Sequence, residues 1–572
     1  MTLRLSHPLA LIPWLTVAIF LSPVILGLVG TWLPAFGWFP AIGLDRLSLA
    51  PWVNLFSHPS FPGAVRHTLV TGLGAAVLAL LSTALLLMGG YPSALFSWLE
   101  KSLAPILSIP HAAFAIGMSF LLVPSGWLVR LLALMSDRLD RPPLWSTFQD
   151  PQGISLIVTL ALKEIPFLLL MCLAILPTLK AQQTLWLAKS LGHNNRFAWL
   201  WLIFPQLYRQ IRLPFFAVLA YSLTVVDIAV IAGPTTPATL AVLITQWFND
   251  PDLSQRTVGA AGAATLLVLL LLIMAGALLL EHPLRRLRSH CLERRLSGHW
   301  PAWEKPMARL ISFVLLFFYA AALLITLIWG LAAQWRYPDV LPSRFSLDKV
   351  ADSLTQLSDP LWCTLLLATL SALLAIIVVV GCLENEVRLK YGSQKVRGQK
   401  ILLLLYLPLL IPQIAFIFGF QVWLIRVGLD GTFVALLWSH LIFVVPYVFL
   451  TLSGPYRQFD DRYSWLALSL TGRRAHSFWR IKLIILLRPI LYAFATGFAV
   501  SIAQYLPTIF VGAGRFATLT TEAVALASGS DRRLMAIMAL WQQLLPLIVF
   551  ALATLIPVYR FRHRRAMSQT AS

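Results

Sequence analysis

Residues 263–280 read AATLLVLLLLIMAGALLL, a run with no charged side chain and one threonine. A helix needs roughly 20 such residues to cross the hydrocarbon core of a bilayer. In lipid the backbone must satisfy its own hydrogen bonds, which leaves helices and closed barrels, and barrel strands alternate apolar with polar residues. The continuous run therefore predicts a transmembrane helix.

The rest of the chain has the same character. Of its 572 residues, 59% are hydrophobic and 12% are charged, whereas soluble domains carry about 25% charged residues. The apolar runs predict an all-α membrane protein with about 12 transmembrane helices in two tandem, pseudo-symmetric six-helix units. The first set is expected at 9–31, 67–90, 103–124, 155–178, 211–233 and 258–281, and the second at 309–334, 361–382, 400–424, 432–453, 489–511 and 534–558.

A basic, tryptophan- and proline-containing stretch from His282 to Pro306 separates the two sets. It predicts a first unit over 1–282, a cytoplasmic linker over 283–308 and a second unit over 309–572. The first apolar segment has no clear small-residue cleavage site, so we expect it to be retained as a helix.

The formal net charge is +21, which in a membrane protein reflects positive-inside topology and attraction to anionic lipid rather than nucleic-acid binding. With alternating helices, 30 of the 44 lysines and arginines fall on one side, which places both termini in the cytoplasm. The longer outer stretches, 32–66 and 125–154, are either interfacial or docking segments or passive connections.

Three sequence blocks recur in the same order in the two sets of helices. Chance agreement is unlikely for tryptophan, glycine, proline and threonine in fixed order, so the halves form a parallel repeat about an axis along the membrane normal. The blocks are IPxxAFxxG at 109–117 and 411–419, WLAxSL at 186–191 and 465–470, and a glycine followed by ATL at 233–240 and 512–519.

The second block opens two loops that are too polar to span a membrane, each on the cytoplasmic side between the fourth and fifth helices of its half. Apolar knobs at Leu187, Leu191, Leu466 and Leu470, with a basic rim, suit docking into a groove of a partner protein. The alternative is a helix lying on the membrane surface. The loop residues are Trp186, Leu187, Ala188, Ser190, Leu191, Gly192 and Pro205 in the first half and Trp465, Leu466, Ala467, Ser469, Leu470, Thr471 and Gly472 in the second.

These loops resemble the signature loop of ATP-binding-cassette (ABC) importer permeases, which reads Glu-Ala-Ala, three residues, Gly, nine residues, then Ile-x-Leu-Pro. Trp186 to Ala188 stand at the Glu-Ala-Ala positions, and Pro205 follows Gly192 by thirteen residues. In the second loop Thr471 takes the Gly position and Ile484 the Pro position, and both copies lack the Glu.

The resemblance is greatest to fused type I permeases of the thiamine, ferric-iron and related small-solute importers. It implies a bacterial inner-membrane permease that works by alternating access, with two ATPase subunits on the cytoplasmic face and a periplasmic solute-binding protein.

No catalytic or cofactor-binding pattern is visible in the sequence. It contains no Gly-x-x-x-x-Gly-Lys-Ser/Thr phosphate loop, so ATP would be used by a partner subunit. No cluster has metal-ligand spacing, and the four cysteines are expected to be inert thiols.

Polar side chains within the spans are candidates for lining a solute pathway, because charges there are costly. The acids Glu164 and Asp227 suit a cationic solute, although hydrogen bonding between helices is the alternative role. They also keep open a second function, an ion-coupled secondary transporter with 12 helices; a membrane enzyme or scaffold lacks any supporting constellation. The candidates are Glu164, Asp227, His111, Gln413, Gln504 and Tyr505, with Lys163 and His440 also within spans.

The third block follows the fifth helix of each half on the outer side. Rigid turns over Gly233–Leu240 and Gly512–Leu519 would either frame the outer mouth or form tight surface turns.

Overall fold

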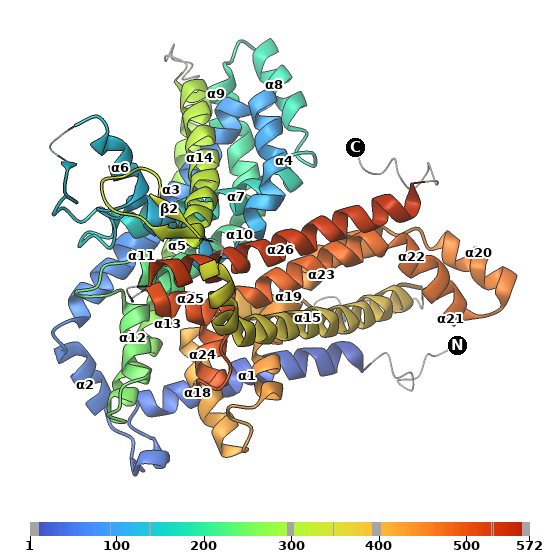
Figure 1. Ribbon diagram of the computed structural model, residues 1–572. Helices are drawn as coiled ribbons and strands as arrows, with labels where there is room; N and C mark the ends of the chain where they lie inside the picture. The colour runs from blue at the N-terminus through green and yellow to red at the C-terminus, as the bar shows by residue number, and fades with distance from the viewer. Residues whose placement is uncertain are drawn as a thin grey trace.

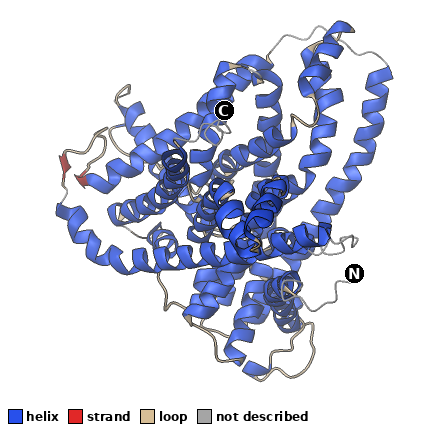
Figure 2. Cartoon of the chain, turned by 90° about the vertical axis from the view of Figure 1, so that its right-hand side faces the viewer, coloured by secondary structure: helices blue, strands red, loops and turns tan. Residues whose placement is uncertain are grey.

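The computed structural model describes residues 11–91, 93–136, 139–293, 303–346, 348–391, 402–527, 529 and 531–562. Within these ranges the regular structure is helical apart from one short antiparallel strand pair, β1 (Ala332–Gln334) and β2 (Arg344–Phe345), as Figure 2 shows. The chain is therefore an all-α membrane protein, as the sequence predicts.

Eight of the predicted spans are continuous helices. Nine helices of the described part are long and apolar enough to cross a membrane, or up to eleven if each of two bent pairs is one span. The continuous spans are α1 (Ile12–Ala35), α3 (Phe61–Gly90), α7 (Ile154–Ile175), α13 (Gln255–Glu293), α14 (Glu304–Leu331), α15 (Asp348–Tyr391), α19 (Phe433–Gln458) and α26 (Arg532–Phe561).

The other four predicted spans, at 103–124, 211–233, 400–424 and 489–511, are each interrupted by a break. Two breaks fall where proline removes a backbone donor, at Pro110 and Pro412. The segments are α4 (Ala94–Ser108) with α5 (His111–Leu122), α10 (Phe204–Thr224) with α11 (Asp227–Ala232), η5 (Leu403–Tyr406) and α17 (Leu407–Leu410) with α18 (Ile414–Arg426), and α23 (Leu487–Ile502) with α24 (Leu506–Gly512).

Shorter elements connect the spans. On the predicted cytoplasmic side each half has a helix followed by a π-helical turn, and on the outer side short helices lie between spans. They are η2 (Pro40–Ile42), α2 (Ala50–Ser57), α6 (Trp127–Ala133), α8 (Ala181–Ser190), α9 (Asn195–Phe197), η4 (Ala198–Ile203), α12 (Leu240–Phe248), α20 (Arg462–Thr471), α21 (Arg474–His476), η6 (Ser477–Lys482), α22 (Leu483–Ile485) and α25 (Leu519–Ala527).

The first helix of each half packs against the other half. Helix α1 lies along α18, and α14 lies along α5 (Figure 1). A Cβ atom added to Gly419 of α18 would lie 2.0 Å from the carbonyl oxygen of Gly27 in α1, and one added to Gly117 of α5 would lie 2.8 Å from the Cβ of Ala322 in α14. The glycine that ends the IPxxAFxxG block in each half is therefore a point of close approach by the exchanged helix, as small residues permit between membrane helices.

The division at 1–282, 283–308 and 309–572 stays a prediction. Helix α13 continues to Glu293, so the start of the predicted linker extends a span, and α14 begins at Glu304. Residues 294–302 of the predicted linker lie outside the described residues.

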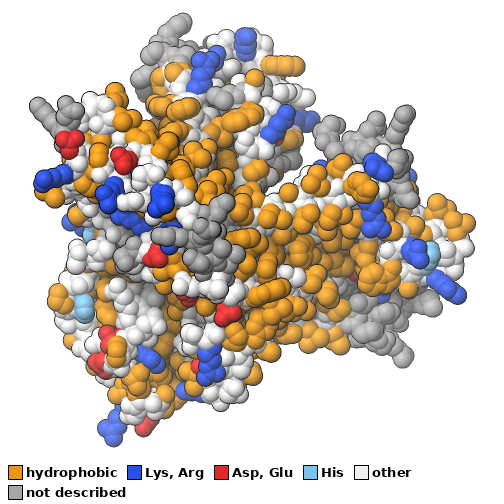
Figure 3. Space-filling model, viewed as in Figure 1, with side chains coloured by type: hydrophobic (Ala, Val, Ile, Leu, Met, Phe, Trp, Pro, Cys, Tyr) orange, Lys and Arg blue, Asp and Glu red, His pale blue; other side chains and the backbone are white. Residues whose placement is uncertain are grey.

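The surface of the long helices is apolar. In α13 only 28% of the most apolar window is buried inside the protein, so most of that window faces outward. Orange side chains cover much of the face in Figure 3. Such a surface fits a lipid environment.

The two ends that carry α8 and α20 diverge. In Figure 1, α14, α4 and α8 rise toward the top, whereas α15, α23 and α26 run to the right toward α20. The space-filling view shows the two lobes separated by an open notch (Figure 3). The halves therefore meet at the end that carries α11, α12 and α25 and are apart at the end with the two loops.

On the predicted outer side, Asp150 caps α7. Its carboxylate accepts hydrogen bonds from the backbone N–H of Ile154 and of Ser155, both at 2.8 Å, and from the Ser155 hydroxyl at 2.6 Å. Burial opposes the charged form, but these hydrogen bonds outweigh it and hold the pKa of Asp150 below its ordinary value. The side chain thus fixes the entry to a span that carries Lys163 and Glu164.

Candidate functional site

The two predicted coupling loops fold as short helices with exposed apolar side chains. In α8, Trp186 is 74% exposed and Leu187 is 65% exposed. In α20, Trp465 is 55% exposed and Leu466 is 60% exposed. Large apolar side chains exposed in matching places on both loops are available for contact with another protein.

Within each helix the alanine of the block points the other way. Ala188 and Ala467 are buried against the bundle, whereas Leu191, directly after α8, and Leu470, in the last turn of α20, are more than 70% exposed. The hydroxyls of Ser190 and Ser469 donate to carbonyls three residues earlier on their own helices. The WLAxSL block therefore encodes one buried anchor and three outward apolar groups.

Each helix ends at a glycine with positive φ, Gly192 at +82° and Gly472 at +65°, a conformation that suits glycine best. In the second loop the glycine that ends the helix therefore lies one residue later than the Gly position obtained by counting along the sequence. Counting along the sequence puts Thr471 at the Gly position, but Thr471 is the last helical residue of α20, and its hydroxyl donates to the Ala467 carbonyl.

After the glycine each loop continues into a π-helical turn, η4 in the first half and η6 in the second. Pro205 then stands at the start of α10, where a missing N–H costs nothing, and Ile484 occupies the matching place in α22. The matching geometry follows the sequence repeat even where the residues differ.

The loops are anchored to the bundle by different ion pairs. Arg196 pairs with Glu304 at the start of α14 and lies over the Trp303 ring at 5.2 Å. Lys482 pairs with Glu384 of α15 at 2.8 Å and lies 3.9 Å from Asp461. The first loop is thus joined to the first helix of the other half, whereas the second is joined to its own half.

The pathway candidates lie at or beside the four breaks. His111 begins α5 and its Nε2 lies 4.0 Å from a Glu164 carboxylate oxygen. Gln413 and Gln504 stand at the two breaks of the second half, and their amides are 3.5 Å apart. The structure thus brings four of the six candidates into two close pairs, one in each half.

Asp227 and Glu164 interact across the boundary between the halves. The Asp227 carboxylate acts electrostatically on the hydroxyls of Tyr221 and Tyr505, and Glu164 acts on Tyr447 of α19. Asp227 opens α11, where the helix dipole favours an acid. Each acid of the first half therefore lies within electrostatic reach of a tyrosine of the second half, Asp227 of Tyr505 and Glu164 of Tyr447.

Lys163 has a structural partner. Its Nζ donates to the carbonyl oxygen of Ile109, at the break between α4 and α5. A carbonyl freed by Pro110 is satisfied in this way. Lys163 thus stabilises the break that presents His111.

Sequence reasoning missed two tyrosines of this cluster. The Tyr221 ring lies 4.8 Å from the His111 ring, and Tyr447 follows Pro446 directly. The signal for Tyr447 was its place beside the proline that aligns the two fourth spans.

The outer segments after the fifth spans share one contact. The Thr68 hydroxyl of α3 accepts from the backbone N–H of Leu240 at 2.8 Å, and that of Thr364 in α15 accepts from Leu519 at 2.9 Å. The leucine of each ATL block is thus the first residue of α12 or α25, and it is held by a hydrogen bond to a threonine in the second span of its own half. Whether these segments frame an outer mouth stays a prediction.

A pseudo-symmetric bundle of spans with polar side chains at its breaks and no phosphate loop in its sequence defines a multi-pass membrane transport protein. The chain is 34% identical over 556 residues to the inner membrane ABC transporter permease protein YnjC of Escherichia coli (strain K12). The aligned residues cover 97% of this chain and 98% of that protein. The chain therefore belongs to the inner membrane ABC transporter permeases. No protein-family model matches it.

Membership of this family decides between the two functions that the sequence left open, an ABC permease and an ion-coupled secondary transporter. An ABC permease works with ATPase partners and is not itself a catalytic enzyme, so the secondary-transporter alternative is not supported. The chain is a multi-pass inner-membrane protein.

Proposed function

We propose that this chain is the translocation subunit of an importer in which α8 and α20 each dock one ATPase subunit. Both termini and both helices face the cytoplasm, and a periplasmic binding protein delivers a small solute to the other side. ATP binding closes the ATPase pair, which draws the diverging ends together and opens the pathway outward. The proposed cargo is thiamine, ferric iron or a similar small solute, because the coupling loops resemble those of that group of importers.

The observation that carries this proposal is the pair of matching exposed apolar helices. Covering a leucine side chain stabilises an interface by about 1.5–3 kcal/mol. Each helix offers a tryptophan and two leucines in the same arrangement, Trp186 with Leu187 and Leu191, and Trp465 with Leu466 and Leu470. Two such surfaces related by the repeat fit two copies of one partner.

The charges of these helices indicate the partner's chemistry. Neither α8 nor α20 contains an acidic residue, and Lys189 lies in the last turn of α8. The family's Glu is replaced by tryptophan in both loops. The docking groove of the ATPase is therefore apolar, with acidic rather than basic side chains at its edge.

The pathway favours a solute with a positive charge. Glu164 has His111 and Lys163 nearby, whereas Asp227 forms no ion pair among the described residues. Asp227 with Tyr221 and Tyr505 can receive a cation or a hydrogen-bond donor.

Co-purification tests the docking. The full chain is expressed with its ATPase, and Leu187→Glu/Leu191→Glu and Leu466→Glu/Leu470→Glu are compared with Leu134→Glu/Met135→Glu. The control leucine and methionine are 73% and 86% exposed on the outer loop. Each loop variant should weaken ATPase binding more than 100-fold, since every 1.4 kcal/mol is tenfold, and the control should bind normally. Unimpaired binding by both loop variants would exclude the proposal.

A further inference from the structure

The fifth spans of the two halves break at the same place but are built differently. The offset of 279 residues aligns Val225 and Val226 with Gln504 and Tyr505. The first hydrogen bond after the break is also matched, from Val230 to Val226 in one half and from Ile509 to Tyr505 in the other.

In the second half, His440 of α19 bridges this break. Its Nδ1 lies 2.9 Å from the Ser501 hydroxyl on α23, and its Nε2 lies 3.0 Å from the Thr508 hydroxyl on α24. The imidazole is buried, with 1% of its surface exposed. One side chain thus bonds to both segments of the broken span.

The Thr508 hydroxyl fixes the direction of these bonds. It donates its one hydrogen to the carbonyl oxygen of Gln504, at 2.9 Å, so it accepts from Nε2–H of His440. Nδ1 of the neutral ring then accepts from the Ser501 hydroxyl at 2.9 Å, which is shorter than the 3.5 Å from that hydroxyl to its other partner, the Ser371 hydroxyl of α15. The chain of bonds reaches the backbone of Gln504, whose amide side chain faces Gln413.

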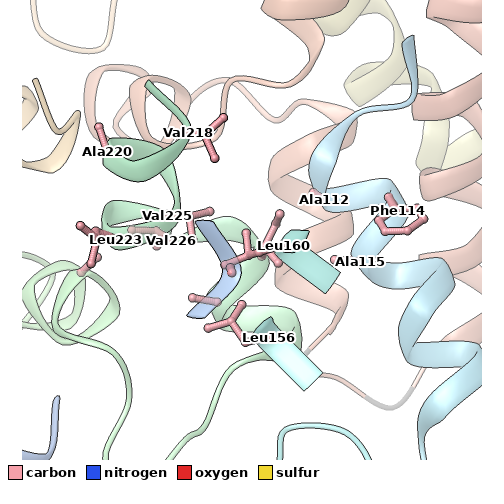
Figure 4. Close-up of a cluster of buried hydrophobic side chains, with 14 of the residues drawn as sticks. Ala112, Phe114, Ala115, Leu156, Leu160, Val218, Ala220, Leu223, Val225 and Val226 are labelled. Carbon is pink, nitrogen blue, oxygen red and sulfur yellow. The ribbon is translucent and has the colours of Figure 1, made fainter. Parts of the chain in front are cut away.

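Among the described residues, the first half has no such bridge. Pro166 and Pro446 align the fourth spans, which places Leu160 opposite His440, and Ala229 stands opposite Thr508. Ser222 corresponds to Ser501, and its hydroxyl is buried without a hydrogen-bond partner among the described residues. Figure 4 shows Leu160, Val225 and Val226 in a cluster of buried apolar side chains.

We propose that His440 is a positioning residue that clamps the break of the second fifth span, so that Gln504 and Tyr505 are held in place at the pathway. Among the described residues no side chain hydrogen-bonds to both segments of the first break, although α11 itself accepts hydrogen bonds from Gln149 and Ser155, so the two segments of this break are the freer to move relative to each other. The inference goes beyond the proposed docking function, because it depends on the two breaks and not on which partner or solute the chain binds.

Hydrogen–deuterium exchange of the full chain in lipid nanodiscs tests the clamp. In the wild type, amides of 503–512 should exchange at least ten times more slowly than those of 225–232. His440→Leu, which copies Leu160, should abolish that difference and leave exchange elsewhere unchanged. His440→Gln keeps one hydrogen-bond donor and one acceptor. The exchange rate of amides 503–512 in this variant should lie within about threefold of the wild-type rate, a difference smaller than the loss of one hydrogen bond would cause.

A matched pair of serine variants keeps the test decisive if His440→Leu does not fold. Ser501→Ala removes the hydrogen bond to His440 and the longer one to Ser371 and should speed exchange of 503–512 at least fivefold. Ser222→Ala removes none and should leave 225–232 unchanged. Equal effects of the two serine variants, equal protection of the two breaks in the wild type, or a general loss of protection in a folded His440→Leu would each overturn the proposal.

Discussion

Replacing Gly419 with alanine should force α1 away from α18 and destabilise the whole bundle. The new Cβ would lie 2.0 Å from the Gly27 carbonyl oxygen and 2.5 Å from the Thr31 nitrogen. These are backbone atoms of a helix, so no side chain can turn away. Since carbon contacts are ordinary at about 3.5 Å, the helices must separate by about 1.5 Å.

The cost has two parts. Overpacking of this kind costs about 1–3 kcal/mol. The separation also breaks the hydrogen bond from Gly419 N–H to the Thr31 hydroxyl, which is 3.1 Å long and contributes about 1 kcal/mol. We expect Gly419→Ala to lower the free energy of unfolding by about 2–4 kcal/mol.

Thermal unfolding in detergent, followed by tryptophan fluorescence, measures the effect. Gly276→Ala is the control, because a Cβ there meets nothing within 4 Å and alanine favours a helix by about 1 kcal/mol. Gly117→Ala, with its nearest contact at 2.8 Å, should fall between them. A Gly419→Ala midpoint at or above that of Gly276→Ala would refute the close approach of the exchanged helix.

Three further predictions concern the loops, the pathway and the outer cap. Arg196→Gln leaves Glu304 without its guanidinium partner, and breaking a buried ion pair costs about 3–5 kcal/mol. In proteoliposomes ATP hydrolysis should then continue while solute uptake falls at least tenfold. Uptake that stays coupled to ATP hydrolysis would contradict the role of this ion pair in anchoring the first loop. Asp227→Asn should reduce uptake of cationic but not neutral solutes from a radiolabelled panel, while equal loss of both would exclude a charge role. Because the pKa of Asp150 is lowered on folding, its contribution to stability is present above about pH 4, the ordinary pKa of an aspartate, and is lost as the pH falls through the lower folded value. Asp150→Asn should therefore unfold at a lower temperature than the wild type at pH 7, and the difference should narrow as the pH is lowered below about 4. A difference that stays the same size as the pH falls would contradict this.

Much of the fold could be predicted because its signals are local. The length of an apolar run fixes a span, and the WLAxSL block with its glycine fixed the loop helices that carry Trp186 and Trp465. The break at Val225 left no such signal, because neither it nor Val226 is a proline and β-branched residues are compatible with a membrane helix. Its extended backbone depends on packing that a window of sequence does not contain.

The long-range pairings were also out of reach. Gly117 and Gly419 were recognised as repeated residues, but only the structure shows that each receives the first helix of the other half. His440 was noted as a polar residue in a span, and its two hydroxyl partners lie 61 and 68 residues away. Which polar groups meet in a bundle depends on helix rotation, so the residue types were predictable and their partners were not.

The differences between the two halves have a physical reason in the fusion of the repeat. In a permease made of two identical chains, an acid at the position of Asp227 would occur twice near the axis, and two carboxylates sharing a site cannot both stay charged. Here the residue opposite Asp227 is Leu506, and Tyr505 of the same break interacts with the single acid. A single chain can therefore keep one charged and mobile break and one amide-lined break clamped by His440, a division of roles that identical subunits could not adopt.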